Sequence, residues 1–117
     1  MLKCRVLGIL LATLSLASHA SFRDGHKLHS WAEADDRIAA GTATEAKDFQ
    51  EAARLSGYVT GVYDFSQRLY CGSENVNIGQ ILDIVKKYLV EHPDLWEERG
   101  SRIVTVALAT AFPCPKK

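Results

Sequence analysis

The segment from Asn77 to Pro93 constrains the fold of this chain more than any other. Its apolar residues recur at the i, i+3, i+4, i+7 spacing of an amphipathic helix: Ile78, Ile81, Leu82, Val85, Tyr88 and Leu89. Asn77 is a favourable N-cap residue, and Pro93 cannot continue a helix. The segment therefore predicts a helix with one apolar face, which must be buried against other elements.

Three further segments have helical character. A short helix is expected between Arg23 and Asp36, followed by a loop over residues 38–44. A long helix is expected over residues 45–70, with Thr44 as its cap. A last helix is expected to start at Ser101, its cap, and to stop at Pro113. Its inward residues would be Ile103, Val104, Ala107, Leu108 and Ala111. Because no segment shows the sustained period-two alternation of strands, the sequence predicts an all-α fold, a small four-helix bundle.

The long helix carries a narrow stripe of small residues that includes Gly57 and Gly61. An interior helical glycine costs about 1 kcal/mol relative to alanine, so a compensating contact is expected. The small-xxx-small spacing would indicate dimerisation in a membrane helix. Since charged residues surround it here, we expect close helix–helix packing in its place.

Residues 1–20 have the three parts of a secretory signal peptide. Lys3 and Arg5 give a positive start, residues 6–17 are apolar, and small residues precede Ser21. A membrane anchor is the alternative, but the apolar run is shorter than the roughly 20 residues that span a bilayer. We therefore expect cleavage before Ser21, a single helical domain over residues 21–117, and a periplasmic location without membrane attachment.

Cys4 would leave with the signal, so Cys71 and Cys114 remain. In an oxidising compartment an isolated pair most simply forms one disulfide, and a free or intermolecular thiol is the alternative. An intramolecular bridge would join the end of the second helix to the end of the fourth. Closing a loop of about 44 residues would add roughly 4 kcal/mol in the chain-entropy model.

Composition excludes several classes of function. The 117 residues carry 14 Lys+Arg and 14 Asp+Glu, so no electrostatic footprint for nucleic acid is present. No phosphate loop and no nucleophile motif occur, so neither enzymatic activity nor a cofactor is expected. His26 and His29 lie three residues apart, but nothing completes a zinc set, and we expect a solvated face and no metal. Asp35-Asp36 is expected to be an exposed helix end.

Two polar loops are the candidate binding elements. Trp96 lies among charged residues in the loop 93–100, and an aromatic side chain ringed by charges suits a protein-binding hot spot. The alternative is that Trp96 folds back over the small core. The turn after Gly72 is the other loop, for which a solvated turn is the alternative. The candidate partner-binding residues are Ser73, Glu74, Asn75, Asp94, Trp96, Glu97 and Glu98.

The order of motifs resembles the Rap/Tai-type immunity proteins of bacterial type VI secretion. A Gly-x-x-Leu-x-x-Trp helix is followed by GYVTGVYD, a Cys-Gly turn, VNIGQILDIV-x-x-YL-x-x-HP and a final AFPC. The resemblance covers residues 22–114, and its most specific parts are residues 57–64, 76–93 and 111–114. Many relatives carry a second cysteine pair where this chain has Trp31-Ala32 and Leu55-Ser56.

The resemblance implies a helical periplasmic protein, often a homodimer, that inhibits a secreted peptidoglycan amidase effector by plugging its active-site cleft with loops. A periplasmic acid-stress chaperone is the alternative, because such chaperones are also small, disulfide-tied helical bundles. A chaperone would expose apolar surface in acid and protect many clients, whereas an immunity protein would bind one partner tightly at neutral pH.

Overall fold

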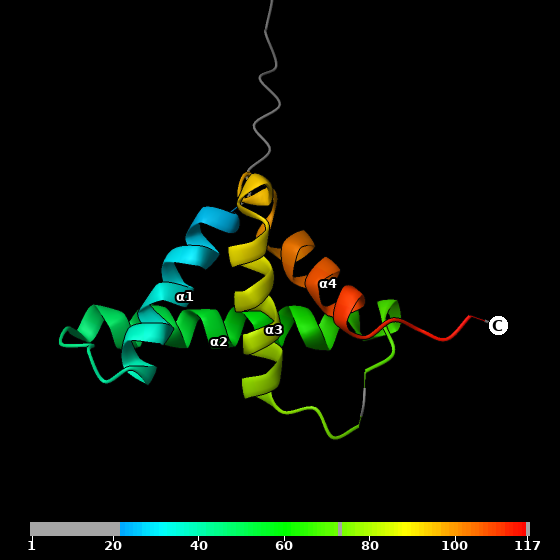
Figure 1. Cartoon of the computed structure of the whole chain (residues 1–117), viewed down its shortest axis with the longest axis horizontal. Helices are drawn as coiled ribbons and strands as arrows, with labels where there is room; N and C mark the ends of the chain where they lie inside the picture. The colour runs from blue at the N-terminus through cyan, green and yellow to red at the C-terminus, as the bar shows by residue number, and fades with distance from the viewer. Residues whose placement is uncertain (1–21, 73, 117) are drawn as a thin grey trace, which may run out of the picture.

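The computed structural model describes residues 22–72 and 74–116, and over these residues the fold is built from α-helices (Figure 1). The expected signal peptide, residues 1–20, lies outside the described part of the chain. The α-helices are α1 (Gly25–Ala39), α2 (Ala46–Ser66), α3 (Ile78–Glu91) and α4 (Gly100–Ala111). Short 3-10 helices, η1 (Gln67–Leu69) and η2 (Pro93–Leu95), follow α2 and α3. The predicted all-α, four-helix architecture is confirmed.

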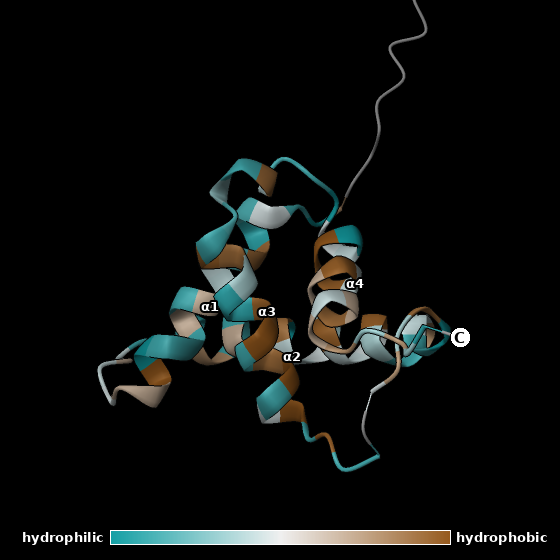
Figure 2. Cartoon of the chain, turned by 45° about the vertical axis from the view of Figure 1, so that its right-hand side comes forward, coloured by the Kyte–Doolittle hydropathy of each residue, from teal (hydrophilic) through white to brown (hydrophobic). Residues whose placement is uncertain are grey.

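The helices cross one another at open angles. α1 and α4 lean together above the long α2, and α3 crosses in front of α2 (Figure 1). Apolar and polar residues alternate around each helix, as amphipathic packing requires (Figure 2). The side chains that are almost completely buried come from all four helices: Leu28, Leu55, Val59, Val85, Leu89, Val104 and Leu108.

The amphipathic patterns of α3 and α4 are confirmed at their centres. Ile81, Val85 and Leu89 are buried in α3. In α4, the buried residues are Gly100, Ile103, Val104, Ala107 and Leu108. The patterns fail only at the helix ends, where Ile78 is 52% exposed and Ala111 is exposed.

The helix caps were predicted with mixed success. Asn77 caps α3 as predicted, and its carboxamide oxygen accepts a hydrogen bond from the Gln80 backbone N–H at 2.9 Å. The caps predicted at Thr44 and Ser101 are wrong. α2 is preceded by Glu45 and α4 by Arg99, and neither makes a side-chain capping hydrogen bond.

Two helix boundaries also differ from the prediction. α1 continues to Ala39, so the first residues of the predicted loop 38–44 are helical. The α-helical part of α2 ends at Ser66, and η1 covers the rest of the expected helix except Tyr70, which is extended. Both differences lie within one helical turn.

Gly57 and Gly61 of α2 face open space and do not pack against another helix. A Cβ atom added at Gly57 or Gly61 would meet nothing within 4 Å. The expectation of close helix–helix packing there is wrong, because Leu55 and Val59, fully buried, turn the opposite side of α2 to the core.

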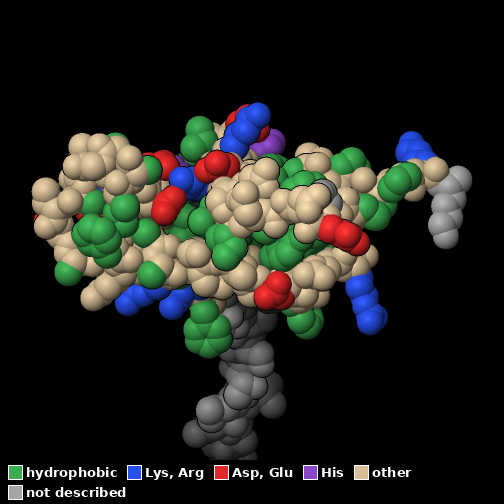
Figure 3. Space-filling model, turned by 90° about the horizontal axis from the view of Figure 1, so that it is seen from below, with side chains coloured by type: hydrophobic (Ala, Val, Ile, Leu, Met, Phe, Trp, Pro, Cys, Tyr) green, Lys and Arg blue, Asp and Glu red, His purple; other side chains and the backbone are tan. Residues whose placement is uncertain are grey.

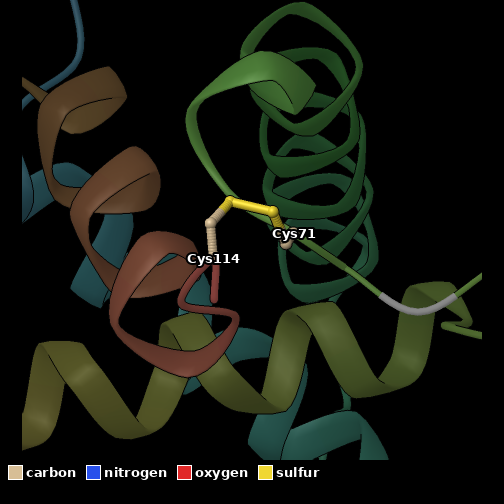
Figure 4. Close-up of a disulfide and its surroundings, with 2 residues drawn as sticks. All are labelled: Cys71 and Cys114. Carbon is tan, nitrogen blue, oxygen red and sulfur yellow. A yellow bond between two sulfur atoms is a disulfide. The ribbon is translucent and has the colours of Figure 1, made fainter. Parts of the chain in front are cut away.

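Cys71 and Cys114 form the predicted intramolecular disulfide, with Cα atoms 4.8 Å apart. The bridge joins the segment after η1 to the segment after α4 (Figure 4). The Cys71 backbone N–H also donates to the Phe112 carbonyl oxygen at 2.9 Å. The two chain segments are therefore held together by a covalent bond and a backbone hydrogen bond.

Candidate partner-binding loops

The loop 93–100 is held against the start of α1 by backbone hydrogen bonds. The N–H of Gly25 donates to the Glu98 carbonyl oxygen and that of His26 donates to the Trp96 carbonyl oxygen, each at 3.2 Å. The Gly100 N–H donates to the Arg23 carbonyl oxygen at 2.8 Å. Three hydrogen bonds within a few residues fix the path of this loop, although it lies at the surface.

Trp96 is half-buried, as the core-covering alternative expected. Its indole N–H donates to the Leu89 carbonyl oxygen at 2.9 Å, and its ring stacks on His29 with centroids 4.0 Å apart. The ring of His26 meets Trp96 edge-on at 5.6 Å. The two histidines considered as metal ligands thus brace this tryptophan. Within the described residues, no group of three or more His, Cys, Asp or Glu is arranged to hold a metal ion.

The carboxylates of the loop 93–100 differ in their freedom to meet a partner. Glu97 and Glu98 both form ion pairs, and Glu97 is the more exposed, with 88% of its side chain accessible. Its Oε1 lies 2.9 Å from His26 Nε2. Glu98 is turned back toward α4, where Arg102 lies 3.3 Å away. Asp94 is exposed. Glu97 and Asp94 are therefore the available carboxylates of this loop.

The loop after Gly72 is anchored at both ends. The disulfide of Cys71 fixes one end, and a reciprocal pair of hydrogen bonds between Asn77 and Gln80 fixes the other. Glu74 and Asn75 are exposed between these anchors. Ser73 lies outside the described residues.

The two loops do not converge on one site. They lie at opposite ends of α3 (Figure 1), which has 14 residues and is therefore about 20 Å long. A partner would need a broad face to touch both, so each loop is a separate candidate contact.

The expected exposed helix end at Asp35-Asp36 is an ion-pair cluster. Lys86 Nζ lies 2.7 Å from Asp35 and 2.9 Å from Asp36. Burial opposes the charge on Lys86, but the hydrogen bonds to the two carboxylates outweigh it and raise the pKa of Lys86. This cluster fastens α3 to α1, which supports the scaffold between the two loops.

A second polar contact fastens α1 to α2. Arg37 Nη2 lies 2.8 Å from Asp48 Oδ1, and this hydrogen bond lowers the pKa of the Asp48 carboxyl. It also raises the pKa of Arg37.

An open groove between α2 and α4, with a volume of about 1090 Å³, was missed by the sequence analysis. Gly57, Gly61 and Phe65 line it on the α2 side, and Arg102 and Val106 on the α4 side. The sequence showed the two glycines but not which side of α2 is buried, so it did not indicate that they line a groove.

These features define a small, all-helical, disulfide-tied protein with a hydrogen-bonded surface loop and an open groove. Over the described residues, none of the helices is both long and apolar enough to cross a membrane. The family of Rap1a immunity proteins matches residues 24–114, and the chain belongs to this family. A search of curated proteins and a search of solved structures each found no match. Membership in an immunity-protein family implies that the chain binds a cognate effector.

Proposed function

We propose that the protein is a periplasmic immunity protein that binds a type VI secretion effector, a peptidoglycan amidase, and plugs its active-site cleft. The family match over residues 24–114 is the observation that carries this proposal. The proposal includes export through cleavage of residues 1–20, pairing of two copies as a homodimer, and inhibition by occlusion without catalysis.

The loop 93–100 is the main plug in this proposal. Its three backbone hydrogen bonds to residues 23–26 hold it in one conformation before binding. A preorganised loop loses less conformational entropy on binding than a mobile one, so more of its contact energy appears as affinity. Glu97 and Asp94 are placed at the surface of this loop, where they can pair with basic residues or a catalytic histidine at the cleft of the effector.

The loop after Gly72 is a second contact. Ser73, Glu74 and Asn75 would reach the rim of the cleft or a neighbouring surface of the effector. Because α3 separates the two loops by about 20 Å, their contributions to affinity should be nearly additive.

The test is inhibition of candidate secreted amidases by oxidised protein comprising residues 21–117. Peptidoglycan hydrolysis and the dissociation constant are measured at neutral pH and moderate salt. One tight partner that loses its hydrolytic activity would support the proposal. Protection of many aggregating clients, seen only in acid and without any amidase partner, would overturn it in favour of the chaperone alternative.

Variants locate the contact within the protein. Glu97→Ala should weaken effector binding by about tenfold or more, as expected of a hot-spot residue. Glu33→Ala changes an exposed carboxylate of α1 outside both loops and serves as the matched control. Equal affinities of the two variants would remove Glu97 from the proposed interface.

A further inference from the structure

Glu97, the exposed carboxylate of the loop 93–100, is held by a histidine of α1. His26 Nε2 lies 2.9 Å from Glu97 Oε1, although the two residues are 71 apart in the sequence. The side chain of Glu97 is 88% exposed and that of His26 is 54% exposed. The backbone N–H of His26 also donates to the Trp96 carbonyl oxygen, and its ring meets the Trp96 indole edge-on. The backbone and ring of His26 therefore place its imidazole against Glu97.

We propose that His26 is a positioning residue for Glu97 and that its charge sets how tightly the effector is bound. Neutral His26 donates a hydrogen bond to Glu97 and leaves the negative charge of the carboxylate for the effector. Charged His26 neutralises that carboxylate, so the affinity for the effector falls in mild acid. This inference rests on the proposed function and deepens it, because it adds a regulator of the proposed contact at Glu97.

Histidine suits this role because it changes its charge between about pH 5 and 8. One ring nitrogen carries a hydrogen in the neutral form, and both do in the charged form. His26 can therefore donate to Glu97 through Nε2 in either state, so the hydrogen bond persists while the charge changes. A carboxylate has two oxygens, so Oε2 of Glu97 can meet a basic group of the effector while Oε1 stays with His26.

The other charged groups around His26 have contacts of their own or keep their charge over this pH range. Glu98 pairs with Arg102 at 3.3 Å, and the Asp24 carboxylate accepts from the Lys27 backbone N–H at 2.9 Å. The guanidinium of Arg23 lies over the ring of Trp31. The remaining charged side chains nearby in the sequence are Lys27, Asp94 and Arg99. Lysine, arginine and carboxylate groups do not change charge in the histidine range, so they add no step of their own.

The two other histidines of the described residues are placed differently. The ring of His29 stacks on Trp96 at 4.0 Å, and the ring of His92 packs on Tyr88 at 4.1 Å. Among residues 22–72 and 74–116, His26 is the histidine that forms an ion pair with a carboxylate. A charge on His29 or His92 would thus act on an aromatic ring and not on Glu97.

The charge of this loop matters because the chain as a whole is balanced. It carries 14 basic and 14 acidic residues, and both kinds are intermixed on the face seen from below (Figure 3). Local charges should therefore decide how a charged partner is recognised. An exposed charge pair is worth at most about a fivefold change in an equilibrium constant. Neutralising Glu97 should accordingly weaken binding about three- to fivefold, less than the loss expected for Glu97→Ala.

The first test uses the oxidised protein comprising residues 21–117 without an effector. Nuclear magnetic resonance follows the His26 imidazole and the side-chain carboxyl carbon of Glu97 from about pH 5 to 8. The Glu97 signal should shift in step with that of His26, because the two groups are in contact. This shift should be absent in His26→Gln and persist in His92→Gln, the matched control. A Glu97 signal that stays constant while His26 gains its charge would overturn the inference.

The second test measures the affinity for the amidase that the hydrolysis assay identifies. From about pH 7.5 to 5.5, the wild type should lose about three- to fivefold more affinity than His26→Gln. Glutamine keeps an N–H donor for Glu97 but cannot become charged, and titration of the amidase itself affects both proteins equally. His26→Lys carries a permanent charge and should bind about three- to fivefold more weakly than His26→Gln at about pH 7.5. Thermal unfolding verifies that each variant is folded.

The outcomes separate this inference from the proposed function. An equal pH dependence of wild type and His26→Gln would overturn the inference and leave the proposed function in place. Equal affinities of His26→Gln and His26→Lys at neutral pH would do the same. A chain that binds no amidase at either pH would overturn the proposed function, and with it the role of His26 in binding, even if the signals of Glu97 and His26 shift together.

Discussion

The backbone of Trp96 packs directly on Gly25. A Cβ atom at position 25 would lie 2.5 Å from the Trp96 Cα and 2.7 Å from the Ile103 Cδ1. Backbone atoms cannot give way as the end of a flexible side chain can, so only glycine fits. This contact places the proposed plug loop directly on the first turn of α1.

Gly25→Ala should therefore destabilise the protein by about 1–3 kcal/mol, the usual cost of overpacking a closed site. Urea unfolding at low micromolar concentration measures the change. Gly57→Ala is the control, because its new methyl group meets nothing within 4 Å of the same chain. It should leave stability unchanged or raise it by up to about 1 kcal/mol. Equal stabilities for the two variants would contradict the close contact at Gly25.

Removal of the disulfide tests the tie between the ends of α2 and α4. Replacing both Cys71 and Cys114 by serine should lower the free energy of unfolding by about 2–4 kcal/mol, because the unfolded chain loses a long closed loop. Urea unfolding in oxidising buffer measures the loss. A reducing agent should destabilise the wild type by the same amount and leave the double variant unchanged. A wild type whose stability does not change on reduction would count against the disulfide.

The ion pair of Asp48 with Arg37 predicts a specific pH dependence. The hydrogen bond from Arg37 lowers the pKa of Asp48 in the folded state, so the carboxylate stabilises the fold above its unfolded pKa of about 3.9. That stabilisation is lost as the pH falls through the lowered pKa. Asp48→Asn should be less stable than the wild type at pH 7, and the difference should shrink toward the lower end of the acid range.

Unfolding of both proteins across this pH range provides the measurement. Asp94→Asn, at an exposed carboxylate of the loop 93–100, serves as the control and should follow the wild type at every pH. A constant difference between Asp48→Asn and the wild type down to strong acid would show that the ionised form of Asp48 contributes nothing.

The adjacent residues Lys86 and Lys87 allow a partly buried ion pair to be compared with a solvated one. Lys86 has only 16% of its side chain exposed and contacts Asp35 and Asp36, whereas Lys87 is 76% exposed with Glu91 at 3.8 Å. Lys86→Met should lower stability by about 1 kcal/mol, because two carboxylates lose their partner. Lys87→Met should stay within about 0.5 kcal/mol of the wild type. Thermal unfolding of both variants at neutral pH decides the point.

How far the sequence predicts this structure depends on what each pattern encodes. The spacing in α3 defines both its helix and its buried side, since Ile81, Val85 and Leu89 are large and only one face is apolar. In α2 the narrow stripe of small residues suits either close helix packing or an open surface, so the pattern indicated a helix but not that Gly57 would face open space. The long-range meeting of Gly25 with Trp96 joins residues 71 apart, and no local pattern carries it.

For the candidate loops, too, the sequence predicted the local features but not the long-range arrangement. Their polar composition and their positions between helices were predictable from glycine, proline and charged residues. Their separation by the length of α3 was not, because it depends on how the helices cross. The packing of Trp96 was left open by the sequence, since an indole beside charged residues suits both a partner and the core.

Trp96 provides the hydrogen bond that Pro93 cannot. In a continuing α-helix the carbonyl oxygen of Leu89 would accept from the backbone N–H of residue 93, but proline has none. The indole N–H of Trp96 donates to that oxygen at 2.9 Å.

Trp96→Phe keeps an aromatic ring against His29 and removes the donor, so it should cost about 1–2 kcal/mol of stability. Pro93→Ala added to this variant restores a backbone N–H at position 93 and should recover part of the loss. Urea unfolding of both variants measures the change in stability. In Trp96→Phe, hydrogen exchange at the amides of residues 96–100 should also become faster, because fewer hydrogen bonds then hold the loop. Unchanged stability and exchange in Trp96→Phe would show that the three backbone hydrogen bonds to residues 23–26 hold the loop without the indole.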